Sequence, residues 1–415
     1  MDTTKSLGQY FTTHLDLIDA VKGFVRNTRG PVLEPSCGAG HIVQHLLPCL
    51  EGRDVTCVEI DDTIEKLPCL QNDGENRNIT CVTGDFLEYD TETRFSTIVG
   101  NPPYVKRYKM RNLYIEFVEK CLGLLADDGG ELVFIIPSDF FKLTSASSVK
   151  ETMVREGTIT DVFHPHNESY FKNAAQDIVV FRYQKGMMGG TTSYNDETKV
   201  VSLQNGNIFF ERIDALDMES GGSASSSGSG SGTGSGSGGR IGLNEVFEVK
   251  VGMVSGADKV FKNARFGNLD IKSFSGTHTY IFLETAPSQE TEGDLVAYLA
   301  THKEALLARR IKKFGEDDWF MWGCPRNTNF MRDNTGKECL YCATITRKST
   351  VFMRGEVGWF DGSLLCLLPK RPVCFDACLR YFNSQDFLSH FKYAGRYKMG
   401  QKILMDCRVP VSLLR

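Results

Sequence analysis

The run Asn101-Pro102-Pro103-Tyr104 carries residue types that suit chemistry on an aromatic amine. The side-chain oxygen of Asn101 and the carbonyl oxygen of Pro102 are two acceptors that can hold both N–H bonds of an exocyclic amine and direct its lone pair toward an electrophile. Two consecutive prolines stiffen the backbone, and Tyr104 offers a flat face on which a base taken out of a duplex can stack. The alternative is a proline-stiffened loop without a chemical role.

A glycine-rich turn, Glu34-Pro35-Ser36-Cys37-Gly38-Ala39-Gly40, lies between the apolar run 31–33 and the helical run 42–47. Glycines allow the backbone to approach a ligand closely, and the start of a helix offers free N–H groups. The turn therefore predicts a ligand-binding loop. Tight strand-to-helix packing is the alternative.

Two further strand ends carry acidic residues, in Glu59-Ile60-Asp61 and in Gly84-Asp85-Phe86. A carboxylate after the second strand of a nucleoside-binding α/β fold is placed to accept ribose hydroxyls. Glu59 alone is an ordinary solvated charge, but beside the glycine-rich turn it is expected to bind a ligand. Asp85 could accept an adenine amino group, and a helix N-cap is an equal alternative.

Six short apolar runs read as buried strands, at residues 31–33, 55–58, 79–82, 96–99, 131–136 and 177–181. Apolar residues at helical spacing lie between them, in one stripe from Leu15 to Val25 and in another from Leu113 to Leu124. This alternation predicts a doubly wound, mostly parallel α/β sheet. The ligand site of such a sheet lies at the carboxyl ends of its strands, where all four motifs fall.

A Gly/Ser-rich segment divides the chain and indicates a flexible linker. We predict a catalytic domain over residues 1–218, a linker over 219–239 and a second domain over 240–415. The second part shows short strand-like pieces at residues 246–251, 280–283, 342–346 and 364–368, with a helix near 294–303, so we expect a mixed α+β domain.

The two parts of the chain differ in charge. Residues 240–415 hold 26 Lys and Arg against 19 Asp and Glu, whereas residues 1–239 hold 21 against 33. A basic part joined to an acidic one suggests contact with a polyanion, although the difference could arise by chance. Basic side chains interleaved with aromatics are the expected phosphate contacts, namely Arg309, Arg310, Lys312, Lys313, Arg347, Lys348, Arg396 and Lys398.

The 13 cysteines are scattered through apolar stretches and are expected to be reduced thiols in an intracellular protein. Cys339 and Cys342 with Cys324 raise the possibility of a zinc site, which we disfavour because no second spaced pair or partner histidine follows. No apolar run approaches the length of about 20 residues that a membrane helix needs, so no membrane contact is expected.

These motifs resemble the γ-class amino-methyltransferases of DNA, the TaqI-type enzymes that methylate N6 of adenine. The segment 7–13, with Gln9-Tyr10-Phe11-Thr12, resembles the family's leading cofactor segment, PSCGAG its cofactor loop and NPPY its catalytic motif. The resemblance covers residues 7–183 well and is only general beyond the linker. It implies a seven-stranded-type methyltransferase sheet followed by a target-recognition domain.

The resemblance also implies roles for individual residues. Asn101, Pro102, Pro103 and Tyr104 would hold the target adenine, and Phe171 would pack on its other face, with the adjacent Tyr170 equally aromatic and a core role open for either. The residues expected to bind S-adenosylmethionine are Tyr10, Phe11, Thr12, Glu34, Pro35, Ser36, Gly38, Glu59, Ile60, Asp85, Phe86, Asn101 and Phe117.

The implied activity is methyl transfer from S-adenosylmethionine to N6 of an adenine flipped out of a short double-stranded DNA sequence. We expect direct transfer with no metal, carried out by a monomer. The enzyme would act in a cell's cytoplasm or nucleoid, or be encoded by a virus. A restriction endonuclease acting on the same site is the candidate partner. The alternatives are transfer to RNA guanine, protein glutamine or cytosine N4, and a silent DNA-binding protein that keeps the fold.

Overall fold

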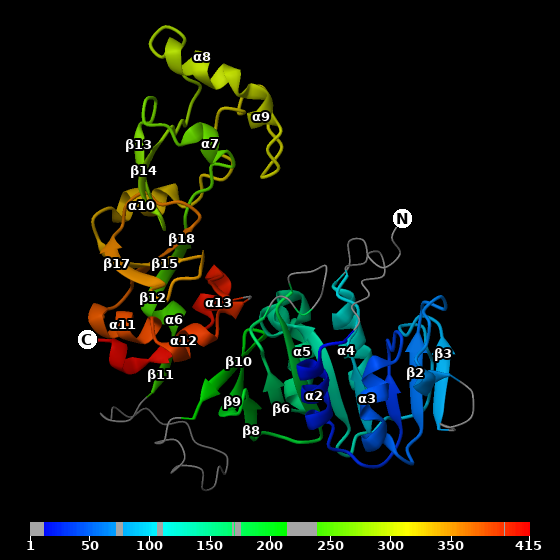
Figure 1. Cartoon of the computed structure of the whole chain (residues 1–415). Helices are drawn as coiled ribbons and strands as arrows, with labels where there is room; N and C mark the ends of the chain where they lie inside the picture. Colours follow the sequence, from blue (N-terminus) through cyan, green and yellow to red (C-terminus); the bar gives the residue numbers. More distant parts are fainter. Residues whose placement is uncertain are drawn as a thin grey trace. The chain divides into compact units, whose positions relative to one another are not determined.

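The computed structural model describes residues 12–71, 78–105, 111–167, 170, 176–213, 239–393 and 395–415. The chain divides into two compact units, residues 1–231 with 393–395 and residues 232–392 with 396–415, so that the division falls within the Gly/Ser-rich segment. The predicted end of the first domain, residue 218, lies outside the described residues, in the stretch 214–238. The predicted start of the second domain, residue 240, lies just after that stretch. Each unit is treated by itself below (Figure 1).

The first unit is built on one sheet, in which seven strands follow the order β3-β2-β1-β4-β5-β7-β6 and the strands β8, β9 and β10 extend the β6 side. The strands are β1 (Val32–Glu34), β2 (Val55–Glu59), β3 (Ile79–Thr83), β4 (Thr97–Gly100), β5 (Glu131–Pro137), β6 (Gly157–Phe163), β7 (Ile178–Lys185), β8 (Thr191–Tyr194), β9 (Glu197–Gln204) and β10 (Asn207–Arg212). Strands β1 to β5 are parallel, and β7 runs antiparallel between β5 and β6. The predicted α/β methyltransferase-like fold is confirmed.

The order of the strands determines where a ligand can bind. The chain runs outward through β1, β2 and β3, and then returns to pair β4 with the other side of β1. A crevice forms at such a reversal because the connections that leave β1 and β4 pass over opposite faces of the sheet. The glycine-rich turn follows β1 and Asn101 follows β4, so both motifs lie at this crevice.

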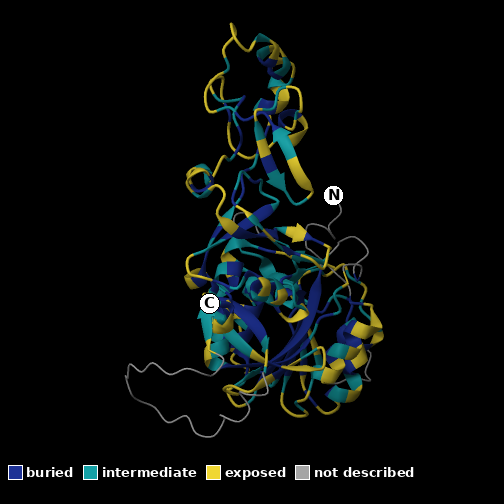
Figure 2. Cartoon of the chain, turned by 90° about the vertical axis from the view of Figure 1, so that its left-hand side faces the viewer, coloured by how far each residue is buried: buried dark blue, intermediate teal, exposed yellow. Residues whose placement is uncertain are grey.

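Helices cover both faces of the sheet (Figure 1). The helices α2 (Leu15–Phe24) and α3 (His41–Leu50) bury Leu17, Val21, Val43 and Leu46 against one face. The helices α4 (Leu113–Leu124) and α5 (Ser147–Glu156) bury their apolar residues against the other face. Adjacent strand residues alternate between the two cores, and Figure 2 shows the strands buried between exposed outer surfaces.

Strand β6 was not predicted, and neither were β8, β9 and β10. The sequence of β6, Gly157-Thr-Ile-Thr-Asp-Val-Phe, mixes polar with apolar residues without a regular alternation, and Thr160 and Asp161 are buried. Burial of polar side chains is tolerated only when they are hydrogen-bonded. These two residues bond each other, and their other partners, Arg182 and Arg26, lie far away in the sequence. Strand β9 is largely exposed, so it carries little apolar pattern.

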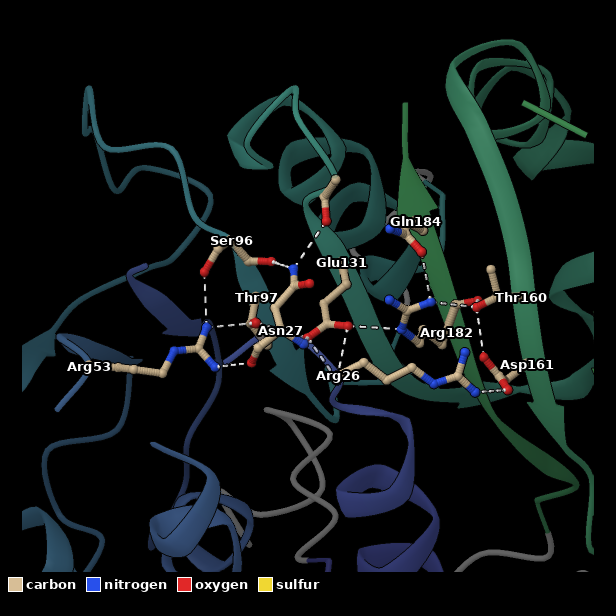
Figure 3. A network of polar contacts seen from close by, with 11 residues as sticks. Arg26, Asn27, Arg53, Ser96, Thr97, Glu131, Thr160, Asp161, Arg182 and Gln184 are labelled. Carbon is tan, nitrogen blue, oxygen red and sulfur yellow. Dashed lines mark hydrogen bonds and ion pairs between the residues drawn. The ribbon is translucent and has the colours of Figure 1, made fainter. Parts of the chain in front are cut away.

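A network of buried charges joins the amino-terminal edge of the sheet (Figure 3). The carboxylate of Glu131, at the start of β5, accepts hydrogen bonds from Arg182 Nε at 2.8 Å, from Thr97 Oγ1 at 3.0 Å and from the backbone N–H of Asn27 at 2.9 Å. Arg182 also donates to Thr160 Oγ1 at 2.8 Å. The network ties β4, β5, β6 and β7 to the segment that follows α2.

The second unit combines short helices with four small sheets. Its central sheet has the order β12-β18-β15-β17, all antiparallel. The strands are β11 (Arg240–Gly242), β12 (Phe247–Val251), β13 (Leu269–Ser273), β14 (Gly276–Tyr280), β15 (Glu338–Ala343), β16 (Ile345–Thr346), β17 (Phe352–Glu356), β18 (Leu364–Pro369), β19 (Lys392–Tyr393), β20 (Arg396–Lys398) and β21 (Arg408–Pro410). The helices are α6 (Leu243–Val246), α7 (Asp258–Phe261), α8 (Gly293–Thr301), α9 (Lys303–Leu307), α10 (Thr328–Asn334), α11 (Phe375–Phe382), α12 (Gln385–Ser389) and α13 (Gln401–Met405).

One detail of the sequence reading of this unit changes. The piece predicted as a strand at residues 280–283 contributes only Tyr280 to β14, and the apolar residues that follow it pack around the buried Trp322. Cys339 and Cys342 are three residues apart in β15, so their side chains point to opposite faces and cannot share a zinc ion. No helix among the described residues is long and apolar enough to cross a membrane.

We expect Glu131→Gln to lower the free energy of unfolding of the first unit by about 3–5 kcal/mol, because Arg182 would then be buried without a countercharge. All three tryptophans, Trp319, Trp322 and Trp359, lie in the second unit. In urea, the unfolding midpoint measured by far-ultraviolet circular dichroism should therefore move to a lower urea concentration. The midpoint measured by tryptophan fluorescence, which reports on the second unit, should not change.

The control is Arg155→Gln, which breaks the exposed ion pair with Glu156 and should cost no more than about 1 kcal/mol. Equal effects of the two substitutions would show that the buried network contributes no more than a surface pair.

Candidate functional site

The carboxyl ends of β1 and β4 lie in direct contact. Ser36 Oγ donates a hydrogen bond to the backbone carbonyl of Asn101 at 3.2 Å. A Cβ added to Gly100 would lie 3.3 Å from Pro35 Cδ, so the absence of a side chain at Gly100 lets the two loops pack this closely. The glycine-rich turn and the NPPY segment therefore form one site, as their positions in the sequence predicted.

Two glycines give the turn after β1 its shape. Gly38 and Gly40 have φ values of 53° and 98°, in the left-handed region that other residues avoid. Gly38 N–H donates to Glu59 Oε2 at 2.7 Å, and the Gly38 carbonyl accepts from Lys66 Nζ at 2.7 Å. Lys66 was not predicted as a site residue, because a lysine in a segment without periodicity gives no signal in the sequence.

Glu34 places a carboxyl group inside this site. The residue is 1% exposed, and its Oε2 has no hydrogen-bond partner among the described residues. Burial raises the pKa of Glu34 well above its usual value, and the nearby Cys37 and Glu59 add to the rise while Lys66 opposes it. A buried carboxyl group of this kind can accept a proton or a cationic ligand.

Glu59 holds the next loop as well as the glycine-rich turn. Its Oε1 accepts a hydrogen bond from the N–H of Asp61 at 3.0 Å. A carboxylate has about four acceptor positions, so Glu59 retains capacity for ligand hydroxyls beyond these two bonds. The adjacent Ile60 is 50% exposed and presents an apolar surface next to the carboxylate.

Asp85, Phe86 and Phe117 form a second group at the end of β3. The N–H of Gly84 donates to the carbonyl of Glu59 at 2.9 Å, which fixes this group beside β2. Asp85 Oδ1 accepts from the N–H of Leu87 at 2.9 Å, so Asp85 stabilises a local turn. Phe86 and Phe117 are buried, with ring centroids 4.9 Å apart.

The carboxamide of Asn101 is held from two sides. Asn101 Nδ2 donates to Thr12 Oγ1 at 3.0 Å, and Asn101 Oδ1 accepts from Tyr104 Oη at 2.5 Å. The hydroxyls of Thr12 and Tyr104 thus hold both ends of the carboxamide. Tyr104 Oη also lies 3.1 Å from the carbonyl of Ile135. The sequence reading assigned Tyr104 to holding the target base and stacking on it, and did not foresee that its hydroxyl contacts Asn101.

Pro102 is buried and Pro103 is half-buried, and both lie beside Asn101 at the end of β4. The predicted site residues Tyr10, Phe11 and Phe171 lie outside the described residues. Tyr170, the alternative to Phe171, is buried and donates from its hydroxyl to Asp16 Oδ2 at 2.6 Å. Burial and the bond to Asp16 raise the pKa of Tyr170 to about 12. These contacts favour the core role for Tyr170.

Two of the predicted basic clusters meet in the second unit. Strand β16 pairs antiparallel with β20, and Thr346 lies opposite Tyr397. Arg347 and Lys348 follow β16 directly, and Arg396 begins β20, so side chains about 50 positions apart in the sequence gather at one end of this small sheet. Arg347, Lys348 and Lys398 are exposed and Arg396 is half-buried.

Arg309 does not suit its predicted role. It is 8% exposed, and its guanidinium donates to the carbonyls of Leu306, Ser255, Met321 and Trp319 at 2.6–2.9 Å. We therefore correct its assignment from phosphate contact to a structural role. The sequence could not separate Arg309 from the exposed Arg310 and Lys313, because four of the five residues 309–313 are basic. Lys312 forms an ion pair with Asp318 at 3.0 Å.

Comparison with known proteins relates the first unit to restriction-modification methylases. Residues 49–171, which include Glu59, Asp85 and the NPPY segment, match the Eco57I restriction-modification methylase family. The chain is 27% identical to the Type II methyltransferase M.HincII of Haemophilus influenzae over 212 residues, which cover 45% of this chain and 39% of that protein.

The modification methylase CviBIII of Paramecium bursaria Chlorella virus NC1A is 36% identical over 149 residues, which cover 32% of this chain and 39% of that protein. The chain thus spans about two fifths of the length of these relatives. A solved structure from Listeria monocytogenes, described as a candidate class I S-adenosylmethionine-dependent methyltransferase, superposes with a TM-score of 0.34 at 17% identity, covering 41% of this chain and 58% of that chain.

We expect Gly40→Ala to distort the turn after β1, because the added Cβ would lie 2.5 Å from Leu70 Cδ1. The left-handed backbone should cost about 1–2 kcal/mol and the overlap about 1–3 kcal/mol more. Gly52→Ala is the control, since Gly52 has a φ of 74° and open space around its added Cβ. Thermal unfolding of both variants measures the difference. An equal loss of stability in both would mean that the packing of Gly40 on Leu70 is unimportant.

Proposed function

We propose that this chain is a DNA methyltransferase that transfers the methyl group of S-adenosylmethionine to the exocyclic N6 of an adenine taken out of a duplex. The single observation that carries the proposal is the Asn101 carboxamide, which is held at both ends by hydroxyl groups at the end of β4 and linked through its backbone carbonyl to Ser36 in the turn after β1. The similarity to modification methylases supports the substrate class.

The residues around the turn fit the proposed cofactor. S-adenosylmethionine supplies a methyl group activated by its bond to a positively charged sulfur. The buried Glu34 Oε2, which has no hydrogen-bond partner among the described residues, suits a positively charged group such as the ammonium of the methionine portion. Glu59 would accept ribose hydroxyls, and Ile60, Asp85 and Phe86 would surround the adenine portion.

Asn101 would bind and orient the target amine. Its Oδ1 would accept one N–H of the amine, and the Pro102 carbonyl would accept the other. Holding both N–H bonds restricts the amine to the orientation in which its lone pair points at the methyl group. The ring of Tyr104 would stack on the base while its hydroxyl keeps Asn101 in place.

The second unit would hold the duplex. The exposed basic residues around β16 and β20 suit contacts to phosphate oxygens, which position a protein on DNA without reading its sequence. A restriction endonuclease acting on the same site, and action as a monomer, are further parts of this proposal that follow from the family resemblance.

The first test is to incubate the protein with tritiated S-adenosylmethionine and unmodified duplex DNA, and then to identify the labelled nucleoside. We expect N6-methyldeoxyadenosine. Label in N4-methyldeoxycytidine would change the target base, and label only in added RNA or protein would overturn the assignment to DNA.

In the same assay, Asn101→Ala should reduce turnover about 100-fold or more, because one of the two acceptors for the amine is lost. Tyr104→Phe is the matched variant: it keeps the ring face and removes only the hydroxyl bonded to Asn101, so a loss of about tenfold is expected. Unchanged turnover in Asn101→Ala would remove the proposed role of Asn101.

The affinity for S-adenosylmethionine should depend on pH through Glu34. Burial favours the protonated carboxyl in the free protein, whereas a cationic ligand favours the carboxylate, so affinity should increase as the pH rises toward the elevated pKa of Glu34 and level off above it. Calorimetric titration between pH 5 and 9 on the wild type and Glu34→Gln measures this dependence.

Glu34→Gln should bind more weakly and lose the pH dependence. It should not unfold more readily at high pH, because it removes the cost of burying a charge, a cost that grows as the pH rises from the ordinary pKa of the carboxyl group to its raised pKa in the folded state and is constant above that. A Glu34→Gln variant with the wild-type pH profile would contradict the role of Glu34.

A further inference from the structure

We propose that His164, His166 and Asp177 bind a divalent transition-metal ion, with zinc the expected occupant. The nearest ligand atoms of these three residues all lie within 4.8 Å of one another. Among the described residues, this is the only such cluster of three histidine, cysteine or acidic side chains. The inference does not depend on the proposed function.

The cluster lies at the carboxyl-terminal edge of the sheet. His164 directly follows β6, and Asp177 directly precedes the antiparallel strand β7, so the two residues are neighbours across the sheet. Both side chains are buried, with exposed fractions of 4% and 0%, and His166 is half-buried. The three residues therefore converge on one point from both ends of the connection between β6 and β7.

The distances suit a small cation. His164 Nε2 lies 2.9 Å from Asp177 Oδ2, and the rings of His164 and His166 have centroids 3.7 Å apart. Zinc binds nitrogen and oxygen at about 2.0–2.2 Å in tetrahedral geometry, which places two ligand atoms about 3.3 Å apart. Small movements of the three side chains would thus bring them into the first coordination sphere.

The chemical types of the three donor groups also suit a divalent cation. Two neutral imidazoles and one carboxylate form a ligand set that zinc and related divalent ions prefer, and a water molecule can complete the coordination.

The residues around the cluster resemble the outer shell of a metal site. A histidine that binds a metal through one nitrogen usually donates a hydrogen bond from the other, and His164 Nδ1 lies 2.6 Å from Tyr194 Oη. Metal binding at Nε2 would move the single ring proton of neutral His164 to Nδ1, where Tyr194 accepts it. Ser138 Oγ donates to Asp177 Oδ2, and Asn195 Oδ1 accepts from the backbone N–H of His164 at 2.6 Å.

The backbone of His166 is suited to this arrangement. Its φ of 55° lies in the left-handed region, which costs energy for a residue with a side chain and is often found at functional sites. The turn brings the His166 ring back over that of His164. A bound ion would fasten the two ends of the β6–β7 connection to each other at the same edge of the sheet as Asn101.

The proposal predicts one Zn²⁺ per folded chain after metal removal with a chelator, reconstitution with zinc and elemental analysis. In His166→Asn this ion should be lost, while the fold should persist because asparagine tolerates the left-handed backbone. The matched control is His278→Asn, a half-buried histidine of the second unit that contacts Ser275 and should keep the ion.

Cobalt substitution distinguishes this site from adventitious binding by cysteine. The wild-type protein loaded with Co²⁺ should show the visible bands of a low-symmetry nitrogen and oxygen site and no thiolate-to-cobalt charge-transfer band. Absence of bound metal in the folded wild type, a thiolate band, or full retention of the ion by His166→Asn would overturn the proposal. If His166→Asn fails to fold, the cobalt spectrum of the wild type decides alone.

Discussion

The first unit depends on the carboxylate of Glu131, a full negative charge buried at the start of the central strand β5. A charge in that position is tolerated only because Arg182, Thr97 and two backbone N–H groups surround it. These partners come from β7, from β4 and from the segment after α2, so the network sets how those elements meet. This network therefore holds the amino-terminal edge of the sheet together, whereas the carboxyl-terminal edge carries the loops of the proposed site.

At the carboxyl-terminal edge, hydrogen bonds from side chains also hold the loops in place, but fewer of them do so. Glu59 fixes the backbone of the turn after β1, and Thr12 and Tyr104 fix the carboxamide of Asn101. Glu34, by contrast, is buried at the centre of that edge with an oxygen that no described residue satisfies. Such an atom destabilises the protein alone and favours a ligand that supplies the missing partner. The contrast between Glu131 and Glu34 separates a structural carboxylate from one that is available for binding.

The sequence predicts the parts of this structure whose signals are local in the chain, and it misses those that depend on contacts between residues far apart in the chain. Strands such as β5, buried along their whole length, and the turn after β1 carry local signals of apolar runs and glycines, and they were predicted correctly. Strand β6 was missed because Asp161 is stabilised by Arg26, which lies 135 positions away, and Arg309 was misassigned because its burial depends on carbonyls that only the folded chain brings together. The grouping of His164, His166 and Asp177 gives no recognisable spacing, since two neighbouring strands create it.

The antiparallel direction of β7 has a consequence for how such a molecule can change over evolution. A parallel pair of strands requires a crossover that packs on the sheet, so altering its length disturbs the core. The connection from β6 to β7 instead leaves and re-enters the sheet at the same edge, between neighbouring strands. Its length can change while the pairing of β6 with β7 stays intact, provided that His164, Tyr170 and Asp177 keep their contacts. The segment beside the proposed site can therefore diverge over evolution without a change in the sheet.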